Sequence, residues 1–219
     1  MAYRLKSGDL PVVRDLNLCI QPGEIVGVLG ESGCGKSTTA LAILGLLPDN
    51  GLVKGSIRFE QTELIGASSQ TLDKIRGARI SLILQEPSLS LNPVLRVVDQ
   101  VAQVLQAHQR LSRSECERRA RATLEQVGMD TVRLQNAYPH QLSGGQRQRV
   151  LIAQAIVCGP SLIIADEPTG SLDATSASEI LGLLRDQVRR LNASLLLITH
   201  APRLLEAIAD RVVVMNAGT

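Results

Sequence analysis

Aromatic residues are almost absent from this sequence. Phe, Trp and Tyr make up 1% of the 219 residues, with no Trp. Rings that could stack on successive bases of a single-stranded nucleic acid are therefore too few. The core must be built from Leu, Ile, Val and Ala, in a chain long enough to bury one large core or a core with a sub-domain.

A large excess of either charge is also missing. Lys and Arg number 23 against 21 Asp and Glu, which leaves a net charge of +2. So small a charge gives no reason to expect a polyanion as the main partner. Together with the few aromatic residues, it predicts that nucleic acid is not among the partners.

Paired cysteines and long apolar segments are missing as well. The four cysteines (Cys19, Cys34, Cys116 and Cys158) form no CxxC pair, so neither a zinc site nor a disulfide framework is indicated. This favours a reduced, cytoplasmic setting. There is no secretion signal, and no stretch reaches the ~18 apolar residues of a membrane-spanning helix. If the protein works at a membrane, another chain must supply the membrane part.

Short apolar runs alternate with helical patterns along much of the chain. The runs cover Glu24–Leu29, Leu162–Ala165 and Ser194–Thr199, and Arg211–Met215 looks like a further strand. Such runs are typical of central strands in a parallel sheet that is covered on both faces. Helical patterns lie between them, over Lys36–Leu47 and Ala177–Leu191. The alternation predicts a three-layer α/β fold.

The middle of the chain differs from both ends. Between Asn92 and Ala137, apolar residues recur at helical spacing and strand signals are few. We interpret Pro87–Gly159 as a helical sub-domain inserted into the α/β core. The prediction is a single domain over residues 1–219, with a core of about residues 1–86 and 160–219 and a helical sub-domain of about residues 87–159.

A glycine-rich loop follows the first predicted strand. Residues 30–37 read GESGCGKS and match GxxxxGK[ST] at every fixed position, between a predicted strand and a predicted helix. Glycines let the backbone N–H groups point at phosphate oxygens. Lys36 would reach the β- and γ-phosphates, and the Ser37 hydroxyl would bind Mg²⁺. The predicted ATP-binding residues here are Gly30, Glu31, Ser32, Gly33, Cys34, Gly35, Lys36, Ser37 and Thr38.

Two adjacent acids follow another predicted strand, in the sequence LIIADEP. The strand delivers Asp166 to the sheet edge, where its carboxylate can hold Mg²⁺ through water. Glu167 can polarise the attacking water as a general base. Two acids at the end of a buried strand are costly unless a metal or a reaction uses them. We therefore predict Asp166 as a metal residue and Glu167 as a catalytic residue.

The segment LSGGQ (Leu142, Ser143, Gly144, Gly145 and Gln146) closes the helical insertion. With the motifs above, it makes the sequence resemble the ABC ATPase family over nearly the whole chain. Further landmarks of that family stand in order: Gln85 as the Q-loop glutamine, Ser171, Leu172 and Asp173 as the D-loop, and His200 as the switch histidine. The resemblance implies a P-loop NTPase (RecA-like) core with a small antiparallel β region near the N-terminus.

The resemblance also implies how these residues share the reaction. Gln85 would contact Mg²⁺ and the attacking water, so the metal residues are Ser37, Gln85 and Asp166. His200 would contact the γ-phosphate and hold Glu167 and water in line. The implied catalytic residues are Lys36, Gln85, Glu167 and His200. Tyr3, the only aromatic residue upstream of the loop, would stack on adenine.

The signature motif starts a predicted helix, and a helix start is an anion site. In the family it faces the γ-phosphate that the other subunit holds. The resemblance therefore implies that two chains sandwich two ATP molecules, with Asp173 contacting the partner chain. The partner is a second ABC ATPase chain, either identical or related.

Two longer segments, Leu84–Val101 and Ala137–Val150, resemble the subgroup that drives oligopeptide, dipeptide and nickel import. The LNP at 91–93 follows the Q-loop, in the region that touches the membrane partner in transporters. The resemblance implies an ATP-hydrolysing subunit that is peripheral on the cytoplasmic face of the cell membrane. Its partners would be transmembrane permease subunits and a solute-binding protein, and its cargo peptides, nickel or a similar small solute.

Other interpretations stay open. Thr169-Gly170-Ser171 is more typical of exporters and lipoprotein-release ATPases than of this subgroup. A soluble ABC ATPase acting on DNA or ribosomes usually has a long coiled coil or two cassettes, and neither is found here. The chain ends at Thr219 without the C-terminal extension common in the subgroup, which fits a regulatory or truncated product. The catalytic residues are all in place, so we expect ATP hydrolysis.

Overall fold

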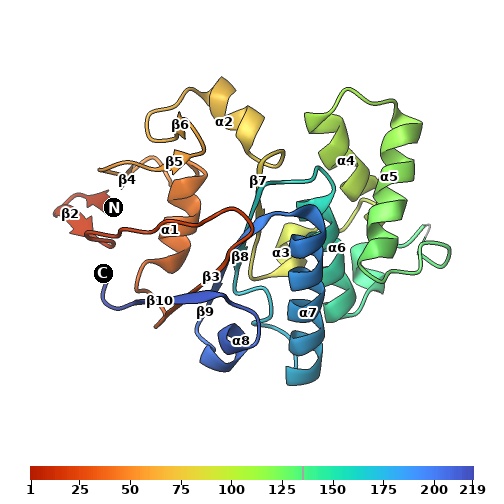
Figure 1. The fold of residues 1–219 in the computed structure, drawn as a ribbon. Coiled ribbons are helices and arrows are strands. Elements are labelled where there is room, and N and C mark those ends of the chain that lie inside the picture. Colours follow the sequence, from red (N-terminus) through yellow and green to blue (C-terminus); the bar gives the residue numbers. More distant parts are fainter. Residues whose placement is uncertain (135) are drawn as a thin grey trace.

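Five parallel strands form the central sheet of the computed structural model, which describes residues 1–134 and 136–219 (Figure 1). Their order across the sheet is β10-β3-β9-β8-β7. The strands are β3 (Ile25–Gly30), β7 (Ile80–Ile83), β8 (Leu162–Asp166), β9 (Ser194–Thr199) and β10 (Arg211–Met215). All pairings in this sheet are parallel. The segments that follow β3, β7, β8 and β9 therefore leave the sheet at the same edge.

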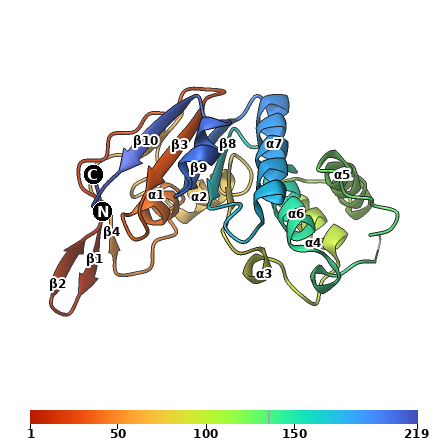
Figure 2. The same cartoon turned by 90° about the horizontal axis from the view of Figure 1, so that it is seen from below.

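Residues of the sheet face two separate hydrophobic clusters. Leu195 and Leu197 of β9 pack in one cluster with α6 (Gly144–Ile156) and α7 (Ala174–Leu191). Leu196 and Ile198 pack in the other with α1 (Lys36–Ile43). Because side chains alternate between the faces of a strand, these helices cover opposite faces of the sheet (Figure 2). The predicted three-layer α/β fold is confirmed.

A small antiparallel region lies near the N-terminus, as predicted. Strand β1 (Ala2–Leu5) pairs with β2 (Gly8–Pro11) and with β4 (Gly51–Leu52), both antiparallel. A second hairpin joins β5 (Arg58–Phe59) to β6 (Thr62–Glu63), and α2 (Ser69–Ile75) follows.

The segment after β7 is helical. It contains α3 (Pro87–Ser90), α4 (Val97–His108), α5 (Arg113–Gln126), a 3₁₀ turn over Pro139–Gln141, and α6. No strand occurs in residues 87–159 as far as the structure describes them. Val101 and Leu105 of α4 pack in one buried cluster with Ala120 and Leu124 of α5. The limits of the sub-domain itself stay a prediction.

Helix α1 ends earlier than predicted, at Ile43 rather than Leu47. Gly45 has a φ of +60°, and its N–H donates to the Ala42 carbonyl. The Leu46 N–H donates to the Leu41 carbonyl at 2.8 Å, which completes a glycine-dependent helix end. The apolar pattern runs on past Gly45, but the left-handed glycine turns the chain away.

The last short helix is α8 (Pro202–Glu206), which follows β9. Within the described residues, no helix combines the length and apolar character that crossing a membrane requires.

Candidate active site

The loop between β3 and α1 needs glycine at two of its positions for lack of space. A Cβ added to Gly30 would lie 2.5 Å from the Met215 carbonyl oxygen. A Cβ added to Gly35 would lie 2.5 Å from Val13 Cγ2, and Gly35 also has a φ of +103°. The loop therefore wraps tightly against β10 and the segment before β3. The loop leads into the start of α1. Backbone N–H groups of a glycine-rich loop at a helix start are an arrangement that binds phosphate.

Lys36, the first residue of α1, is held inside this loop. Its side chain is only 7% exposed. Its ammonium donates hydrogen bonds to the carbonyl oxygens of Gly30 (2.7 Å) and Glu31 (2.8 Å). The positive charge is thus fixed at the mouth of the loop, where it would meet phosphate oxygens.

Asp166, at the end of β8, is buried and faces the same loop. Burial raises the pKa of Asp166, and the nearby Glu167 raises it further, while a hydrogen bond with the Ser37 side chain and the charge of Lys36 oppose the rise. Its Oδ1 is buried with no hydrogen-bond partner among the described residues. A buried carboxylate oxygen without a partner, beside a serine hydroxyl, is the donor set that Mg²⁺ prefers. The two residues therefore fit the predicted metal role.

Glu167 follows directly and turns away from β8. Its φ of +50° is uncommon for a residue with a side chain, and its N–H donates to the Ile198 carbonyl of β9 at 2.9 Å. This turn carries the carboxylate toward the end of β9. There Glu167 Oε1 lies 2.8 Å from Nδ1 of His200, whose side chain is 65% exposed. The structure thus brings the predicted base and the predicted switch histidine into contact.

Thr199 also contacts this carboxylate, a residue that sequence reasoning missed. Its Oγ1 donates to Glu167 Oε2 at 3.4 Å and accepts the Ala201 N–H at 3.1 Å. The only signal in the sequence is its place directly before His200.

Gln85 lies just after β7, at the same edge of the sheet. A Cβ added to Gly170 would lie 3.3 Å from Gln85 Nε2. The glutamine side chain therefore reaches over the turn that follows Glu167, whose carbonyl accepts the Gly170 N–H. This places it beside the acidic pair, as the predicted metal and water contact requires.

Tyr3 approaches the site from β1. Its hydroxyl lies 3.4 Å from Thr38 Oγ1, within hydrogen-bond distance. The ring is therefore near the end of the phosphate loop, which fits the predicted contact with a nucleotide base. Ser32 and Cys34 lie in the phosphate loop, and the Cys34 side chain is buried.

The signature motif lies elsewhere. Ser143 caps α6: its hydroxyl accepts the Gln146 N–H, and the Gln146 side chain accepts the Ser143 N–H. Leu142 is buried. Helix α6 packs on the opposite face of the sheet from α1 (Figures 1 and 2). Neither hydrogen bonds nor ion pairs join the signature to Lys36 or Glu167 in the described part of the chain.

The D-loop connects the acidic pair to α7. Asp173 accepts the N–H groups of Thr175 and Ser176, and these bonds, led by Ser176, lower the pKa of Asp173. Because the cap begins the helix, α7 starts at Ala174 rather than at the predicted Ala177. Leu172, after Ser171, lies 3.5 Å from where a Cβ on Gly144 would be, so the D-loop touches the signature of the same chain.

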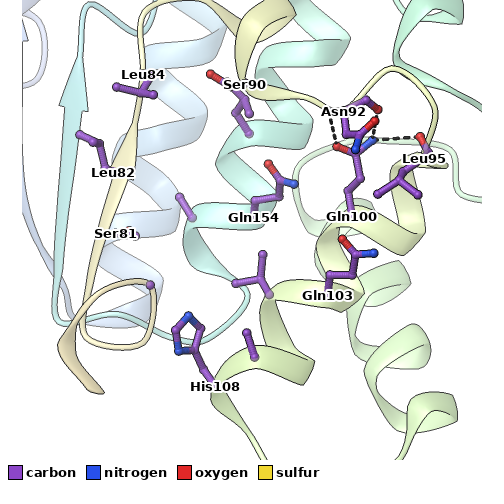
Figure 3. Close-up of a pocket in the computed structure, with 15 residues that line it drawn as sticks. Ser81, Leu82, Leu84, Ser90, Asn92, Leu95, Gln100, Gln103, His108 and Gln154 are labelled. Carbon is purple, nitrogen blue, oxygen red and sulfur yellow. Dashed lines mark hydrogen bonds between the residues drawn. The ribbon is translucent and has the colours of Figure 1, made fainter. Parts of the chain in front are cut away.

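A groove of about 580 Å³ lies between β7, α3, α4 and α6 (Figure 3). It is lined by Ser81, Leu84, Ser90, Asn92, Gln103 and Gln154, among others. The Gln100 side chain accepts the Asn92 N–H and donates to the carbonyls of Asn92 and Leu95. The LNP turn at the groove is therefore rigidly held. Leu84, which lines the groove, is 44% exposed. Leu89 of α3 and Val94, in the chain segment next to it, are 81% and 75% exposed.

Comparison with known proteins was consistent with this geometry. The sequence profile of the family described as "ABC transporter" matches residues 13–170. The chain is 42% identical to the oligopeptide transport ATP-binding protein OppD of Escherichia coli K12 over 219 residues, which is all of this chain and 65% of the relative. It is 43% identical to AppD of Bacillus subtilis 168, over 97% of this chain and 66% of the relative. The chain thus spans about 65% of the length of the OppD relative that it matches.

Solved structures agree with the fold. The dimeric ATP-binding cassette MJ0796 bound to ADP and Pi superposes with a TM-score of 0.86 at 29% identity, covering 99% of this chain and 91% of that one. The cassette cbiO1 of Clostridium perfringens, part of the transporter complex cbiONQ, gives a TM-score of 0.84 at 30% identity, covering 99% of this chain and 82% of that one.

Proposed function

Because this chain belongs to the ABC transporter family, we propose that it is the ATP-binding and ATP-hydrolysing subunit of a membrane transporter. The observation that carries the proposal is the meeting of Lys36, Asp166, Glu167 and His200 at one edge of the parallel sheet. Ligands of open α/β sheets bind at this edge. ATP would lie on the glycine-rich loop, with Tyr3 against its base.

The residues divide the reaction between them. A water oxygen attacks the γ-phosphorus, the bond from that phosphorus to the oxygen bridging to the β-phosphate breaks, and ADP and phosphate result. Glu167 orients the water and accepts its proton, and His200 holds the carboxylate in place. Lys36 stabilises negative charge on the phosphate oxygens. Ser37, Asp166 and Gln85 would hold Mg²⁺, which neutralises phosphate charge when bound.

The chain acts as a dimer in this proposal. The signature helix start is an anion site, yet it packs on the other face of the sheet from the phosphate loop. A second cassette, identical or related, would bring its signature to this chain's ATP. The dimeric MJ0796 cassette supports this arrangement. Residues 87–159 would form the helical sub-domain that carries the signature, and the D-loop would lie at the contact between the two chains.

We further propose an importer subunit on the cytoplasmic face of the membrane, bound to permease subunits and served by a solute-binding protein. Relatives named as oligopeptide transport proteins support peptides as the cargo, with nickel or a similar small solute as the wider class. The groove beside α3, which Leu84 lines, and the exposed Leu89 and Val94 in the chain segment next to it would receive a helix of the permease. An exporter or lipoprotein-release role is the second candidate, favoured by Gly170 in the turn after Glu167.

The direct test is ATP turnover by the purified chain with Mg²⁺. Replacing Glu167 by Gln removes the general base, so the rate should fall roughly 10²- to 10⁴-fold while ATP binding persists. The matched control is Glu179→Gln, an exposed glutamate on α7 that pairs with Arg149. A Glu167→Gln variant that turns over ATP at the wild-type rate would overturn the assignment, as would a wild-type chain that binds no ATP.

A further inference from the structure

The end of β9 holds both oxygens of the Glu167 carboxylate with two consecutive residues. His200 Nδ1 contacts Oε1 at 2.8 Å, and the Thr199 hydroxyl contacts Oε2 at 3.4 Å. Thr199 is 3% exposed, so its hydroxyl has little access to water as an alternative partner. The carboxylate is therefore held against rotation by two consecutive residues, the last of β9 and the one that follows it.

The contacts of the Thr199 hydroxyl determine which group it donates its hydrogen to. A hydroxyl carries a single hydrogen and two acceptor lone pairs. Thr199 Oγ1 already accepts the Ala201 N–H at 3.1 Å, which fixes one lone pair. The carboxylate at Oε2 can only accept, so the hydroxyl donates to it. At 3.4 Å this bond is long and acts more on direction than on energy.

The backbone of Glu167 is tied to the same strand. Its N–H donates to the Ile198 carbonyl at 2.9 Å, and its φ of +50° costs strain that these contacts must offset. Ile198 thus fixes the backbone of Glu167, Thr199 its Oε2 and His200 its Oε1. The geometry places the general base by three contacts from one segment.

We propose that Thr199 is a positioning residue for hydrolysis, which sets the rotation of the Glu167 carboxylate so that its free lone pairs face the attacking water. This rests on the proposed function, since it gives Glu167 the role of base. Thr199 makes no contact with ATP in this proposal. Its loss therefore slows the chemical step without weakening nucleotide binding.

The test compares Thr199→Val with Thr199→Ser by steady-state ATP hydrolysis. Valine keeps the shape and removes the hydroxyl, so kcat should fall about 3- to 10-fold, the range for one hydrogen bond, with KM for ATP within about twofold of the wild type. Serine keeps the hydroxyl and should restore kcat. The control is Thr123→Val on α5, another buried threonine, whose hydroxyl donates to the Arg119 carbonyl. It should leave kcat unchanged.

Three results would overturn the proposal: an unchanged kcat in Thr199→Val, a rise in KM without a fall in kcat, or a serine variant as slow as the valine variant. If Thr199→Val does not fold, as judged by thermal unfolding, Thr199→Ala takes its place under the same criteria. Failure of the proposed function looks different, because then wild-type turnover is absent or Glu167→Gln leaves it intact.

Discussion

At the residue scale, Lys36 connects the structure most directly to nucleotide affinity. Its ammonium is buried and bonded to two loop carbonyls, at Gly30 and Glu31. A charge that is already desolvated and aimed is worth more to an incoming phosphate than a free surface lysine. The same side chain also ties the loop to α1.

Lys36→Ala should therefore weaken ATP binding. A hydrogen bond to a charged group contributes about 1.5–3 kcal/mol, so the Kd for ATP should rise roughly 10- to 100-fold. A fluorescent ATP analogue titrated into the purified variant measures this. Lys74→Ala, at an exposed lysine of α2, is the control and should bind as the wild type does. Equal affinity in both variants would contradict the role of Lys36.

The proposed catalytic side chains could be picked out at this scale because their motifs are local. Lys36 belongs to a motif of contiguous residues, and Asp166 and Glu167 are adjacent. Thr199 was not predictable in the same way, since its bond to Glu167 joins residues 32 positions apart. A threonine has no meaning as a motif until the fold brings its hydroxyl to a carboxylate.

At the scale of elements, burial explains why the strands β3, β8 and β9 could be predicted. Strands β3, β8 and β9 lie inside the sheet, and β8 and β9 are buried along their whole length, so their sequences are continuous apolar runs. Strand β7 carries the buried Ser81 within its four residues, which interrupts the pattern. Strand β2 is exposed throughout, and β4, β5 and β6 have two residues each, too few to show a period.

The pairing of β3 with β10 is supported at its start by an ion pair. Arg211, the first residue of β10, donates from Nε to Glu24 Oε1 at 2.8 Å. That hydrogen bond, followed by one from the Gln21 N–H, lowers the pKa of Glu24 below its ordinary value of 4.5, against the opposing effect of burial. A carboxyl whose pKa is lower in the folded state stabilises the fold above its unfolded pKa.

Glu24→Gln should therefore cost stability in a pH-dependent way. At pH 7 the free energy of unfolding should fall by about 0.2–1 kcal/mol, the range for a surface pair. As the pH falls below 4.5 and through the folded pKa, wild type and variant should converge. Urea denaturation at pH 7 and at a pH below 4.5 measures the difference between wild type and variant. Glu206→Gln, at an exposed position on α8, is the control and should leave the free energy of unfolding at pH 7 as in the wild type. A pH-independent difference for Glu24→Gln would contradict the ion-pair argument.

At the scale of the whole molecule, two surfaces of this chain are proposed to bind other chains. Helix α1, which follows the phosphate loop, and the signature helix α6 cover opposite faces of the sheet, and a second cassette would bring its own signature to this chain's phosphate loop. The groove beside α3 is lined in part by the exposed Leu84, and Leu89 of α3, next to the groove-lining Ser90, is 81% exposed. The resemblance in the sequence implies both partners, a second cassette and the permease subunits. The fold shows that the surfaces proposed for them are different ones.

Docking of a permease in that groove predicts a strong effect of Leu89→Glu. Burying a leucine side chain contributes about 1.5–3 kcal/mol, so its loss should weaken the complex roughly 10- to 100-fold. The variant would be made in the Glu167→Gln background, which should hold the closed ATP-bound dimer, and recovered from gently solubilised native membranes. The measured quantity is the amount of polytopic membrane protein that co-purifies with the tagged chain.

The matched control is Val132→Glu, because Val132 is 83% exposed in the turn after α5, away from the residues that line the groove. Both substitutions add the same charge at a surface of equal exposure, so general effects of charge or solubility would act on both. Only Leu89→Glu should lose the membrane subunits. If both variants recover them equally, the permease binds elsewhere on the cassette. If both lose them equally, the added charge rather than the groove decides the outcome, and the exposed apolar side chains beside α3 need another explanation.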